Sequence, residues 1–567
     1  MITYSEDLGE GFYLSLIKGF RTDLATICII QLIPWLTIFV NDKFDSFRRI
    51  YYIIFITVIS LIEASGIGLY QEWGEILNPR GLEYLSTPSV VMTSVLDTKF
   101  LLLFILLLAV LWLLSRMVKR VKKERLNIKW FWQIGVILLG IVILFLGVRG
   151  GVQKLPLKYS SAYYSTSPLD NFIAVNNSYY LLNTVLKSKK ENQPILSDEE
   201  TSVFLSKYRQ EIDSTSTPDF KGENVVMIVL EGWVHDVVKK KENVPYISEL
   251  MSKSIVFDQM YSSGFRTDQG MLSLFSGVPA YKGDNLLTKC ADNVRLPSLF
   301  KKLKENNYKT SFFYGGSCDF SNLGAYLLTQ GVENLVGEDQ LGADLNRMDW
   351  GVEDALVLEE LRKHLNKEQQ PFFSTVLTLS THPPFDIPGG TNCSDTDNKD
   401  SCKYAQSLVY LDNSIRDFMN ESSSQPWFQS TIFIFTADHG STYYGHRSFN
   451  DHERFRIPFF IYDPKQGNAR LIKHKTSLHD APTMIMYMLG IEYQSEEFKI
   501  SVNPFEMTHP VYWSTNSSSA WITDSSNIVI DNEKESVINS SNTTDSLNTE
   551  YIKNIHDCRS LIWKVIE

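Results

Sequence analysis

The first 150 residues contain apolar runs that are too long and too continuous for the core of a small soluble domain. The most extreme is LLLFILLLAVLWLL, at residues 101–114. Four apolar segments stand out, at about Leu24–Val40, Ile50–Tyr70, Lys99–Met117 and Lys129–Val148. Each has roughly the length that a helix needs to cross the hydrocarbon core of a bilayer. The sequence therefore predicts about four transmembrane helices within residues 1–150.

Charges between these segments predict their orientation. The segment Arg116–Lys129 (RMVKRVKKERLNIK) is densely basic, so we expect it in the cytoplasm. The acidic segment Gln71–Asp97 is then outside, and so is everything after Val148. The same count places the N-terminus outside, with Lys18 and Arg21 on the outer face. A further preceding helix, or a partial or interfacial helix formed by the first seventeen residues, would account for those two charges.

Beyond the apolar region the sequence pattern changes. We expect a transmembrane region at 1–150 and a juxtamembrane helical connector at 151–218. From 219 to 510, β-branched apolar runs alternate with amphipathic segments, which predicts an α/β domain with a mostly parallel sheet covered on both faces. Residues 511–567 predict a small antiparallel meander, a polar mobile loop (NEKESVINSSNTTDSLNTE) and a terminal helix.

Charge and cysteine usage exclude some classes of function. The formal net charge of −11 over 567 residues argues against a nucleic-acid partner held by electrostatics. The six cysteines include no C-x-x-C pair, so a thiolate zinc site is not expected. Cys393 and Cys402 flank a polar loop, and outside the cytosol they would form either a disulfide or two free thiols.

Chemically active side chains stand at the ends of two predicted strands and at the start of one predicted helix. Glu231 ends the apolar run NVVMIVL, Thr267 stands where the loop SSGFRTDQG enters a helix, and Asp438-His439 end the run TIFIFTADHG. In open α/β sheets ligands bind at the carboxyl ends of the strands. Two carboxylates, an imidazole and a hydroxyl suit one divalent metal that also ionises the hydroxyl. Individually, Thr267 also suits a helix N-cap, and the others suit turn or surface positions.

These motifs, with TLSTHPPF around His382 and with FFYGGSCDF, resemble the alkaline phosphatase/sulfatase superfamily. They are most similar to its lipoteichoic acid synthase branch of phosphoglycerol transferases, and the resemblance covers about residues 19–510. It implies an N-terminal α-helical transmembrane bundle, an alkaline phosphatase-like α/β domain with a mostly parallel central sheet, and a small β-rich tail. It also implies a bacterial cytoplasmic membrane protein with its catalytic domain outside.

The resemblance gives each matching residue an expected role. Thr267 matches the threonine that attacks a phosphodiester and carries the transferred head group. Glu231, Asp438 and His439 match the residues that, with Thr267, hold one divalent ion, Mn²⁺ or Mg²⁺, with Zn²⁺ as an alternative. His382 matches a histidine near the substrate phosphate. A threonine hydroxyl has a pKa far above neutral, so it needs such a cation to become a nucleophile.

Further residues are assigned from their position beside these motifs. Arg266 precedes the threonine and would neutralise the substrate phosphate. His452 and His446 are candidates for a proton donor or a further ligand, and His452 has the better spacing. Phe320 would stack on a head group, or it is an ordinary core aromatic.

The chain also departs from its apparent relatives. Thr267-Asp-Gln-Gly replaces the Cys/Ser-x-Pro-x-Arg motif of sulfatases, which argues against sulfate-ester hydrolysis. Val229 stands where lipoteichoic acid synthases carry a histidine. Phe320 and Asn322 stand where those enzymes carry a tryptophan and an arginine that contact glycerol phosphate, so a changed head-group pocket is expected.

The resulting hypothesis is a membrane-bound, metal-dependent transferase. It would move a phosphoglycerol-type head group from a phospholipid donor to an extracytoplasmic glycan or lipid acceptor through a phospho-threonine intermediate. The alternatives within the superfamily are a phosphoethanolamine transferase and a phosphodiesterase. An alternative of another class is an inactive, membrane-bound binding or sensor protein.

Overall fold

The computed structural model forms two compact units, Met1–Glu191 and Asn192–Glu567, which are described separately. The described residues are 12–39, 43–73, 77, 116, 129–153, 156–165, 168–187, 195–212, 220, 223–282, 286–287, 296–342, 345, 347–348, 350–393, 399–441, 443–444, 450–465, 469–515, 518–532, 534–541 and 544–566.

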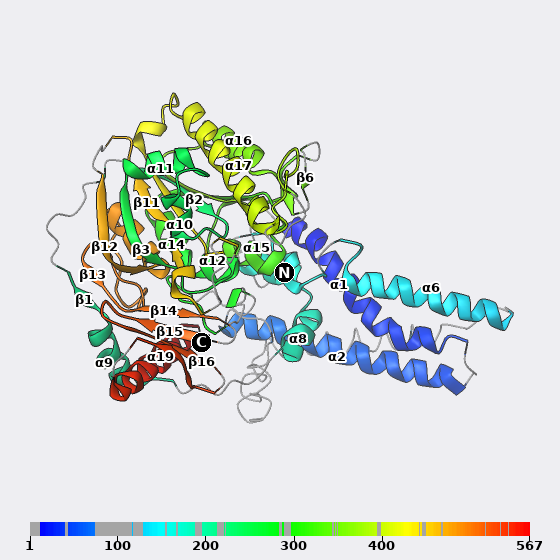
Figure 1. The fold of residues 1–567 in the computed structure, drawn as a ribbon. Coiled ribbons are helices and arrows are strands. Elements are labelled where there is room, and N and C mark those ends of the chain that lie inside the picture. The colour runs from blue at the N-terminus through cyan, green and yellow to red at the C-terminus, as the bar shows by residue number, and fades with distance from the viewer. Residues whose placement is uncertain are drawn as a thin grey trace. The chain divides into compact units, whose positions relative to one another are not determined.

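Three long helices stand out among the described residues of the N-terminal unit (Figure 1). They are α1 (Phe12–Leu36), α2 (Lys43–Trp73) and α6 (Trp130–Arg149). Within the described residues, two stretches are long and apolar enough to cross a membrane, at Phe44–Gly66 and Trp130–Arg149. The first of these overlaps the second predicted segment, Ile50–Tyr70, and the other matches the fourth, Lys129–Val148, to within one residue at each end. The third, Lys99–Met117, lies outside the described residues apart from Arg116.

The first predicted segment needs correction. Helix α1 begins at Phe12 rather than near Leu24, and it is not one of the two described stretches that are apolar enough to cross a membrane. Its N-terminal half carries Lys18, Arg21 and Asp23. In this half of the helix, small and polar residues such as Ser15 are buried. Their packing explains why the helix begins before its apolar part.

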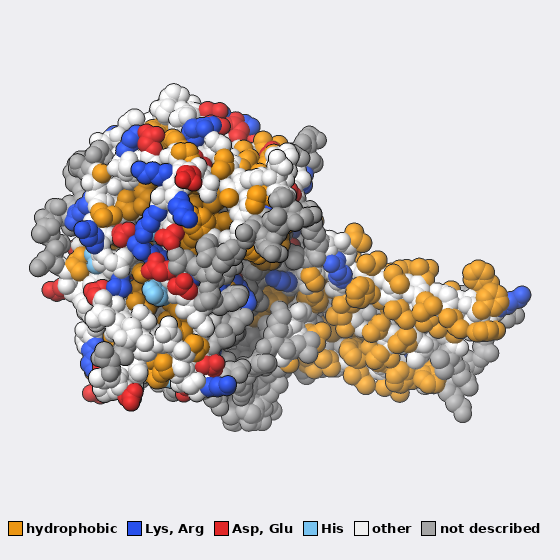
Figure 2. All heavy atoms as spheres, viewed as in Figure 1, with side chains coloured by type: hydrophobic (Ala, Val, Ile, Leu, Met, Phe, Trp, Pro, Cys, Tyr) orange, Lys and Arg blue, Asp and Glu red, His pale blue; other side chains and the backbone are white. Residues whose placement is uncertain are grey.

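Helices α1 and α6 approach each other at glycines. A Cβ on Gly140 would lie 1.9 Å from the Trp35 ring, and a Cβ on Gly147 would lie 2.3 Å from Cys28 Sγ. Trp35 Nε1 also donates to the Ile137 carbonyl at 3.1 Å. Small residues allow such close helix packing in membranes. The outer faces of the helices are covered with hydrophobic side chains, as Figure 2 shows.

The segment after α6 packs back onto these helices. Glu63 of α2 accepts hydrogen bonds from Asn177 Nδ2 at 2.8 Å and from Ser178 N at 3.3 Å, at the start of α8. A carboxylate at a helix N-terminus compensates its unsatisfied amides. The other elements described in this unit are η3 (Tyr159–Ala162), α7 (Pro168–Ala174) and α8 (Asn177–Lys187).

A nine-stranded sheet forms the centre of the second unit. In spatial order it contains β10 (Arg456–Ile457), β3 (Ile255–Tyr261), β11 (Phe459–Tyr462), β9 (Thr431–Ala437), β2 (Asn224–Leu230), β8 (Phe372–Leu377), β4 (Lys309–Tyr314) and β5 (Asn334–Val336), while β12 (Arg470–Ser477) also pairs with β3. Strands β9, β2, β8, β4 and β5 are parallel, and β11 is antiparallel to both β9 and β3. The predicted mostly parallel sheet is confirmed.

Two groups of helices accompany this sheet. One group is α11 (Pro245–Ser252), α16 (Asp354–Leu365) and α17 (Lys399–Ser422), and the other is α12 (Thr267–Ser276), α14 (Leu299–Glu305) and α18 (Ala481–Met488). Strands β2, β8 and β9 are buried along their whole length, which explains their uninterrupted apolar sequences. Shorter elements are α10 (His235–Lys239), η4 (Phe320–Asn322), α15 (Leu323–Thr329), β6 (Arg347–Met348), β7 (Gly351–Val352), η5 (Phe428–Ser430), η6 (His452–Arg454) and η7 (Leu478–Asp480).

The C-terminal part contains more regular structure than expected. The antiparallel meander is present as β14 (Val511–Ser514), β15 (Ser518–Ile522), β16 (Asn527–Asp531) and β17 (Val537–Ser540), followed by α19 (Asp545–Ile566). The prediction of a mobile loop from NEKESVINSSNTTDSLNTE is wrong, because β17 and the start of α19 lie in it. Ser540 Oγ donates to Asn548 Oδ1 at 2.7 Å, so its polar side chains connect these elements.

One helix of the predicted connector belongs to this second unit. Helix α9 (Asp198–Tyr208) packs against α19, where Lys564 Nζ lies 2.7 Å from Asp198 Oδ1. Its buried Phe204 and Tyr208 contact Trp521 of β15. A short pair, β1 (Gln210–Glu211) with β13 (Met507–Thr508), follows it.

Candidate active site

A cavity of about 370 Å³ lies at the carboxyl ends of the central strands. Glu231 directly follows β2, and Asp438-His439 directly follow β9. Because Leu230 pairs with Ala437 in the parallel ladder, these strand ends are neighbours. Thr267 is the first residue of α12 and lines the same cavity. The structure thus brings together four residues that are far apart in the sequence.

Their functional atoms lie close to one another. Thr267 Oγ1 donates to Glu231 Oε2 at 3.1 Å. His439 Nε2 lies 3.2 Å from Glu231 Oε1 and 3.5 Å from Asp438 Oδ2. One ligand atom from each of Glu231, Asp438 and His439 lies within 4.8 Å of the other two. This is the spacing of a site with room for one cation.

Neighbouring backbone groups fix the orientation of these side chains. Asp438 Oδ1 accepts hydrogen bonds from Gly232 N at 3.0 Å and His439 N at 2.9 Å. Asp438 Oδ2 is buried and has no hydrogen-bond partner among the described residues. His439 Nδ1 donates to the Gly440 carbonyl at 3.2 Å, which turns Nε2 toward the carboxylates. Two carboxylates and one imidazole, with an unsatisfied buried oxygen, fit a divalent metal ion.

Electrostatics show that the cluster attracts positive charge. Burial opposes ionisation of Glu231, but the charges of His439 and His382 hold its pKa at about 2. Burial, together with the charge of Glu231, raises the pKa of Asp438 to about 8. Burial opposes a charge on His439, but Asp438 and Glu231 raise its pKa to about 9. Asp438 and His439 therefore bind protons more tightly than usual. A metal cation bound between them would compensate the same negative charge.

Two glycines of the motifs allow close backbone contacts at the site. A Cβ on Gly270, in the first turns of α12, would lie 2.5 Å from the Asp438 carbonyl oxygen. A Cβ on Gly440 would lie 1.8 Å from the Arg454 carbonyl oxygen. Helix α12 and the loop after β9 are therefore in direct backbone contact, which sets the distance between Thr267 and the metal-ligand candidates.

Other residues predicted for the site are distributed around the cavity. His382, Arg266 and Phe320 line it. His382 Nδ1 donates to the Pro383 carbonyl at 2.8 Å. The described lining does not include His452, whose side chain is 41% exposed with Nε2 3.6 Å from Glu453. His446 lies outside the described residues.

The sequence analysis missed several cavity residues. Phe265 and Arg454 line the cavity. Trp350, in the turn between β6 and β7, lies with its ring 4.4 Å from that of His382 and 5.6 Å from that of Phe320. Trp350 is not among the described lining residues, but its ring contacts two side chains that are, His382 and Phe320. No local motif marks Trp350 or Arg454, because only the tertiary fold brings them to the site.

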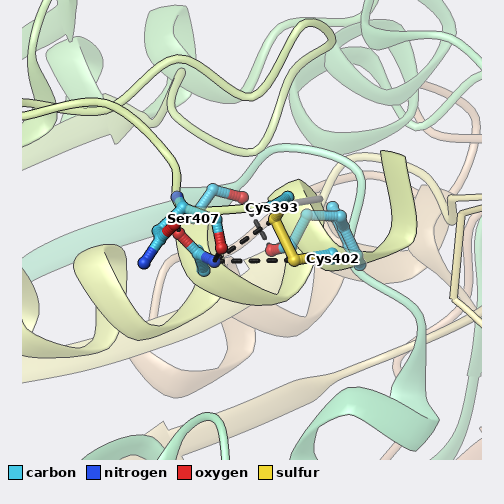
Figure 3. Close-up of a disulfide and its surroundings, with 6 residues drawn as sticks. Cys393, Cys402 and Ser407 are labelled. Atoms are coloured by element: carbon cyan, nitrogen blue, oxygen red, sulfur yellow. Dashed lines mark hydrogen bonds between the residues drawn. A yellow bond between two sulfur atoms is a disulfide. The ribbon is translucent and has the colours of Figure 1, made fainter. Parts of the chain in front are cut away.

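Cys393 and Cys402 form a disulfide, which decides between the two alternatives left open by the sequence (Figure 3). It lies at the start of α17, and Gln406 Nε2 is 3.2 Å from Cys393 Sγ. The adjacent Ser401 Oγ donates to the Tyr443 carbonyl at 3.0 Å. Tyr443 lines the cavity, so the disulfide-closed segment supports one of its walls.

Comparisons with known proteins agree with this architecture. The sulfatase family model matches residues 223–491. A lipoteichoic acid synthase-like protein of Bacillus subtilis (strain 168) is 22% identical over 350 residues, which are 56% of this chain and 56% of the relative. Lipoteichoic acid synthase 2 of the same strain is 23% identical, over 56% of this chain and 53% of the relative. Phosphoglycerol transferase I of Escherichia coli (strain 55989) is 27% identical, over 34% of this chain and 26% of the relative.

The matched regions therefore span about half the length, or less, of these curated relatives. Among solved structures, an alkaline phosphatase superfamily protein from Vibrio parahaemolyticus has a TM-score of 0.54 at 19% identity, covering 65% of this chain and 97% of that one. Lipoteichoic acid synthase LtaP from Listeria monocytogenes has a TM-score of 0.52 at 17% identity, with the same coverage. Residues 223–491 are thus a sulfatase-family domain built on the alkaline phosphatase fold, in a chain related to lipoteichoic acid synthases and phosphoglycerol transferases.

Proposed function

We propose that the chain is a membrane-bound phosphotransferase that uses Thr267 as its nucleophile. The donor is a phospholipid with a phosphoglycerol-type head group, and the acceptor is an extracytoplasmic glycan or lipid. The observation that carries this proposal is the position of Thr267 Oγ1, 3.1 Å from Glu231 and at the N-terminus of α12. Backbone amides at a helix N-terminus stabilise a phosphorylated side chain.

The reaction proceeds in two displacements. In the first, Thr267 Oγ forms a bond to phosphorus, the bond to diacylglycerol breaks, and diacylglycerol takes up the proton that the threonine loses. In the second, an acceptor hydroxyl attacks phosphorus, the bond to Thr267 breaks, and the acceptor proton returns to the threonine. Arg266 and His382 border the cavity, where they would contact the phosphoryl oxygens.

Glu231, Asp438 and His439 would hold one divalent cation, Mn²⁺ or Mg²⁺ with Zn²⁺ as the alternative. When bound, such an ion lowers the pKa of a coordinated hydroxyl and neutralises phosphoryl charge. The donor set and the unsatisfied Asp438 Oδ2 support this assignment. The apolar helices of the N-terminal unit would keep the catalytic domain near lipid head groups and raise their effective concentration.

Intact-protein mass spectrometry tests the proposal. The full chain is incubated with Mn²⁺ and mixed phospholipids beside two variants, Thr267→Ala and Thr267→Ser. We expect an adduct mapped to Thr267 in the parent and none in the alanine variant, while the serine variant retains a hydroxyl and a weaker adduct. The mass of the adduct identifies the head group and so separates phosphoglycerol from phosphoethanolamine.

Diacylglycerol release gives the second measurement. Release that requires Thr267 but leaves no adduct would replace the transferase by a phosphodiesterase with a short-lived intermediate. Absence of both adduct and release with every lipid would refute a lipid-dependent phosphotransferase and favour a binding or sensor role.

A further inference from the structure

Arg454 is a buried arginine in the wall of the catalytic cavity. It ends η6 and lies just before the edge strand β10, and the residue is only 6% exposed. Its guanidinium carbon lies 5.6 Å from the ring centre of Phe265 and 5.8 Å from that of Phe455. The Arg454 carbonyl lies against Gly440, so the residue is positioned directly by the loop that carries Asp438 and His439.

Two guanidinium groups contact the same aromatic ring beside the nucleophile. The Arg266 guanidinium carbon lies 4.9 Å from the centre of the Phe265 ring, and Arg454 lies 5.6 Å from it. Arg266 is exposed to solvent, whereas Arg454 is buried. A charge that is removed from water interacts more strongly with a bound anion than a solvated one does. Arg454 therefore has the stronger field inside the cavity.

The chemistry of this group suits a phosphodiester. Burial lowers the pKa of Arg454 to about 10, so the side chain stays cationic at neutral pH and gains from an anionic ligand. A planar guanidinium matches phosphate oxygens with two parallel hydrogen bonds, and it stacks on aromatic rings such as Phe265. Because Arg266 and Arg454 line the same cavity, a phosphoryl group bound there would lie near two cations.

We propose that Arg454 binds a non-bridging phosphoryl oxygen of the donor and of the phospho-threonine, as a substrate-binding residue that no local motif reveals. This inference rests on the proposed function, because it needs a phosphoryl group at Thr267. In this inference, Arg454 makes the stronger interaction with the phosphoryl group. Arg266 makes a weaker one, because solvent screens its charge.

Steady-state kinetics of the full chain in detergent with Mn²⁺ and a chromogenic phosphodiester test this proposal. The variants are Arg454→Met, Arg454→Lys and Arg266→Met. Arg456→Lys is the matched control, because Arg456 follows two residues later and its Nη2 is 3.0 Å from Asp258 Oδ2. We expect Arg454→Met to lower kcat/KM by about 10- to 100-fold, the range for hydrogen bonds to a charged group. The decrease in kcat/KM should be smaller for Arg454→Lys and Arg266→Met. The kcat/KM of Arg456→Lys should stay near that of the parent.

Two further readouts separate phosphate binding from a structural role. Inorganic phosphate should inhibit the parent competitively, and its inhibition constant should rise in Arg454→Met in proportion to the lost kcat/KM. Mn²⁺ affinity, followed by electron paramagnetic resonance, should stay at the parent value. Millimolar guanidinium should restore part of the activity of an Arg454→Ala variant.

Each result has a defined meaning. Parental kcat/KM in Arg454→Met overturns the inference, and so does an unchanged phosphate inhibition constant. A parallel loss of Mn²⁺ affinity also overturns it, because Arg454 would then act by shaping the metal-ligand loop. An inactive parent instead refutes the proposed function, which the mass-spectrometric experiment detects independently.

Discussion

Adding one methyl group at Gly270 should reduce catalysis without removing any chemical group from the site. The Cβ of Gly270→Ala would lie 2.5 Å from the Asp438 carbonyl oxygen and 2.8 Å from Asp438 Cβ. Both atoms belong to a buried loop that cannot swing aside as the end of a flexible side chain would. Ordinary van der Waals contact begins at 3.4 Å, so α12 and this loop must separate by about 0.9 Å.

This displacement acts directly on the reacting atoms, because α12 carries Thr267 and the loop carries Asp438-His439. A misplacement of about 1 Å in a catalytic constellation costs about 100-fold in rate, so we expect kcat to fall by about that factor. Overpacking should also destabilise the domain by about 1–3 kcal/mol. The intrinsic preference of helices for alanine over glycine acts in the opposite direction by about 1 kcal/mol.

The assay is turnover of a chromogenic phosphodiester with Mn²⁺, together with the melting temperature of the purified chain. Gly135→Ala in α6 is the matched control, since a Cβ there meets no atom within 4 Å. That variant should keep its activity and its melting temperature, or gain slightly in the latter. If Gly270→Ala retains the parental kcat and melts at a higher temperature, the stabilisation from helix propensity exceeds the steric cost. The steric argument is then refuted.

Three other changes test separate parts of the molecule. Glu231→Gln should abolish high-affinity Mn²⁺ binding in a calorimetric titration, because it replaces one of three clustered charged or imidazole ligands by a neutral amide; undiminished binding would contradict the metal assignment. Gly147→Leu should lower the melting temperature of the N-terminal unit, since its side chain would displace Cys28; unchanged melting would argue against close α1–α6 packing. His509 Nε2 lies 2.9 Å from Asp480 Oδ2 in the core, and although burial opposes both charges, the pair raises the pKa of His509 and lowers the pKa of Asp480. The stabilisation from His509 is fully present below its unfolded pKa of about 6.5 and is lost as pH rises through the raised folded value, whereas that from Asp480 is lost as pH falls below about 3.9. Melting temperatures should therefore decline toward alkaline pH in the parent and decline less in His509→Gln, and equal slopes would contradict the ion pair.

The central site was predictable because its signals are local. Glu231 and Asp438-His439 each follow a continuous apolar strand, and Thr267 starts a helix. Parallel strands end at the same edge of a sheet, so the pattern alone predicts that these side chains gather there. The mostly parallel sheet followed from the same alternation of strands and helices.

The remaining features depend on tertiary contacts that sequence patterns do not report. Trp350 stands between β6 and β7 and contacts the cavity-lining rings of His382 and Phe320, and Arg454 reaches the cavity through an edge segment held against Gly440. The polar stretch that contains β17 lacks an apolar pattern, and it becomes ordered by pairing with β16 and by hydrogen bonds to α19. Helix α1 continues before its apolar part because its small and polar residues pack against neighbouring segments of the same unit.

The disulfide between Cys393 and Cys402 has a consequence for when the proposed active site becomes competent. Such bonds form in oxidising compartments outside the cytosol. Ser401, beside Cys402, holds the carbonyl of Tyr443 in the cavity wall. Under the proposed function, a domain whose two cysteines are still reduced would lack the covalent closure beside the Ser401–Tyr443 contact, and its activity would be lower. We expect the Cys393→Ser/Cys402→Ser double variant to turn over phosphodiesters more slowly than the oxidised parent, and equal rates would show that the wall needs no covalent closure.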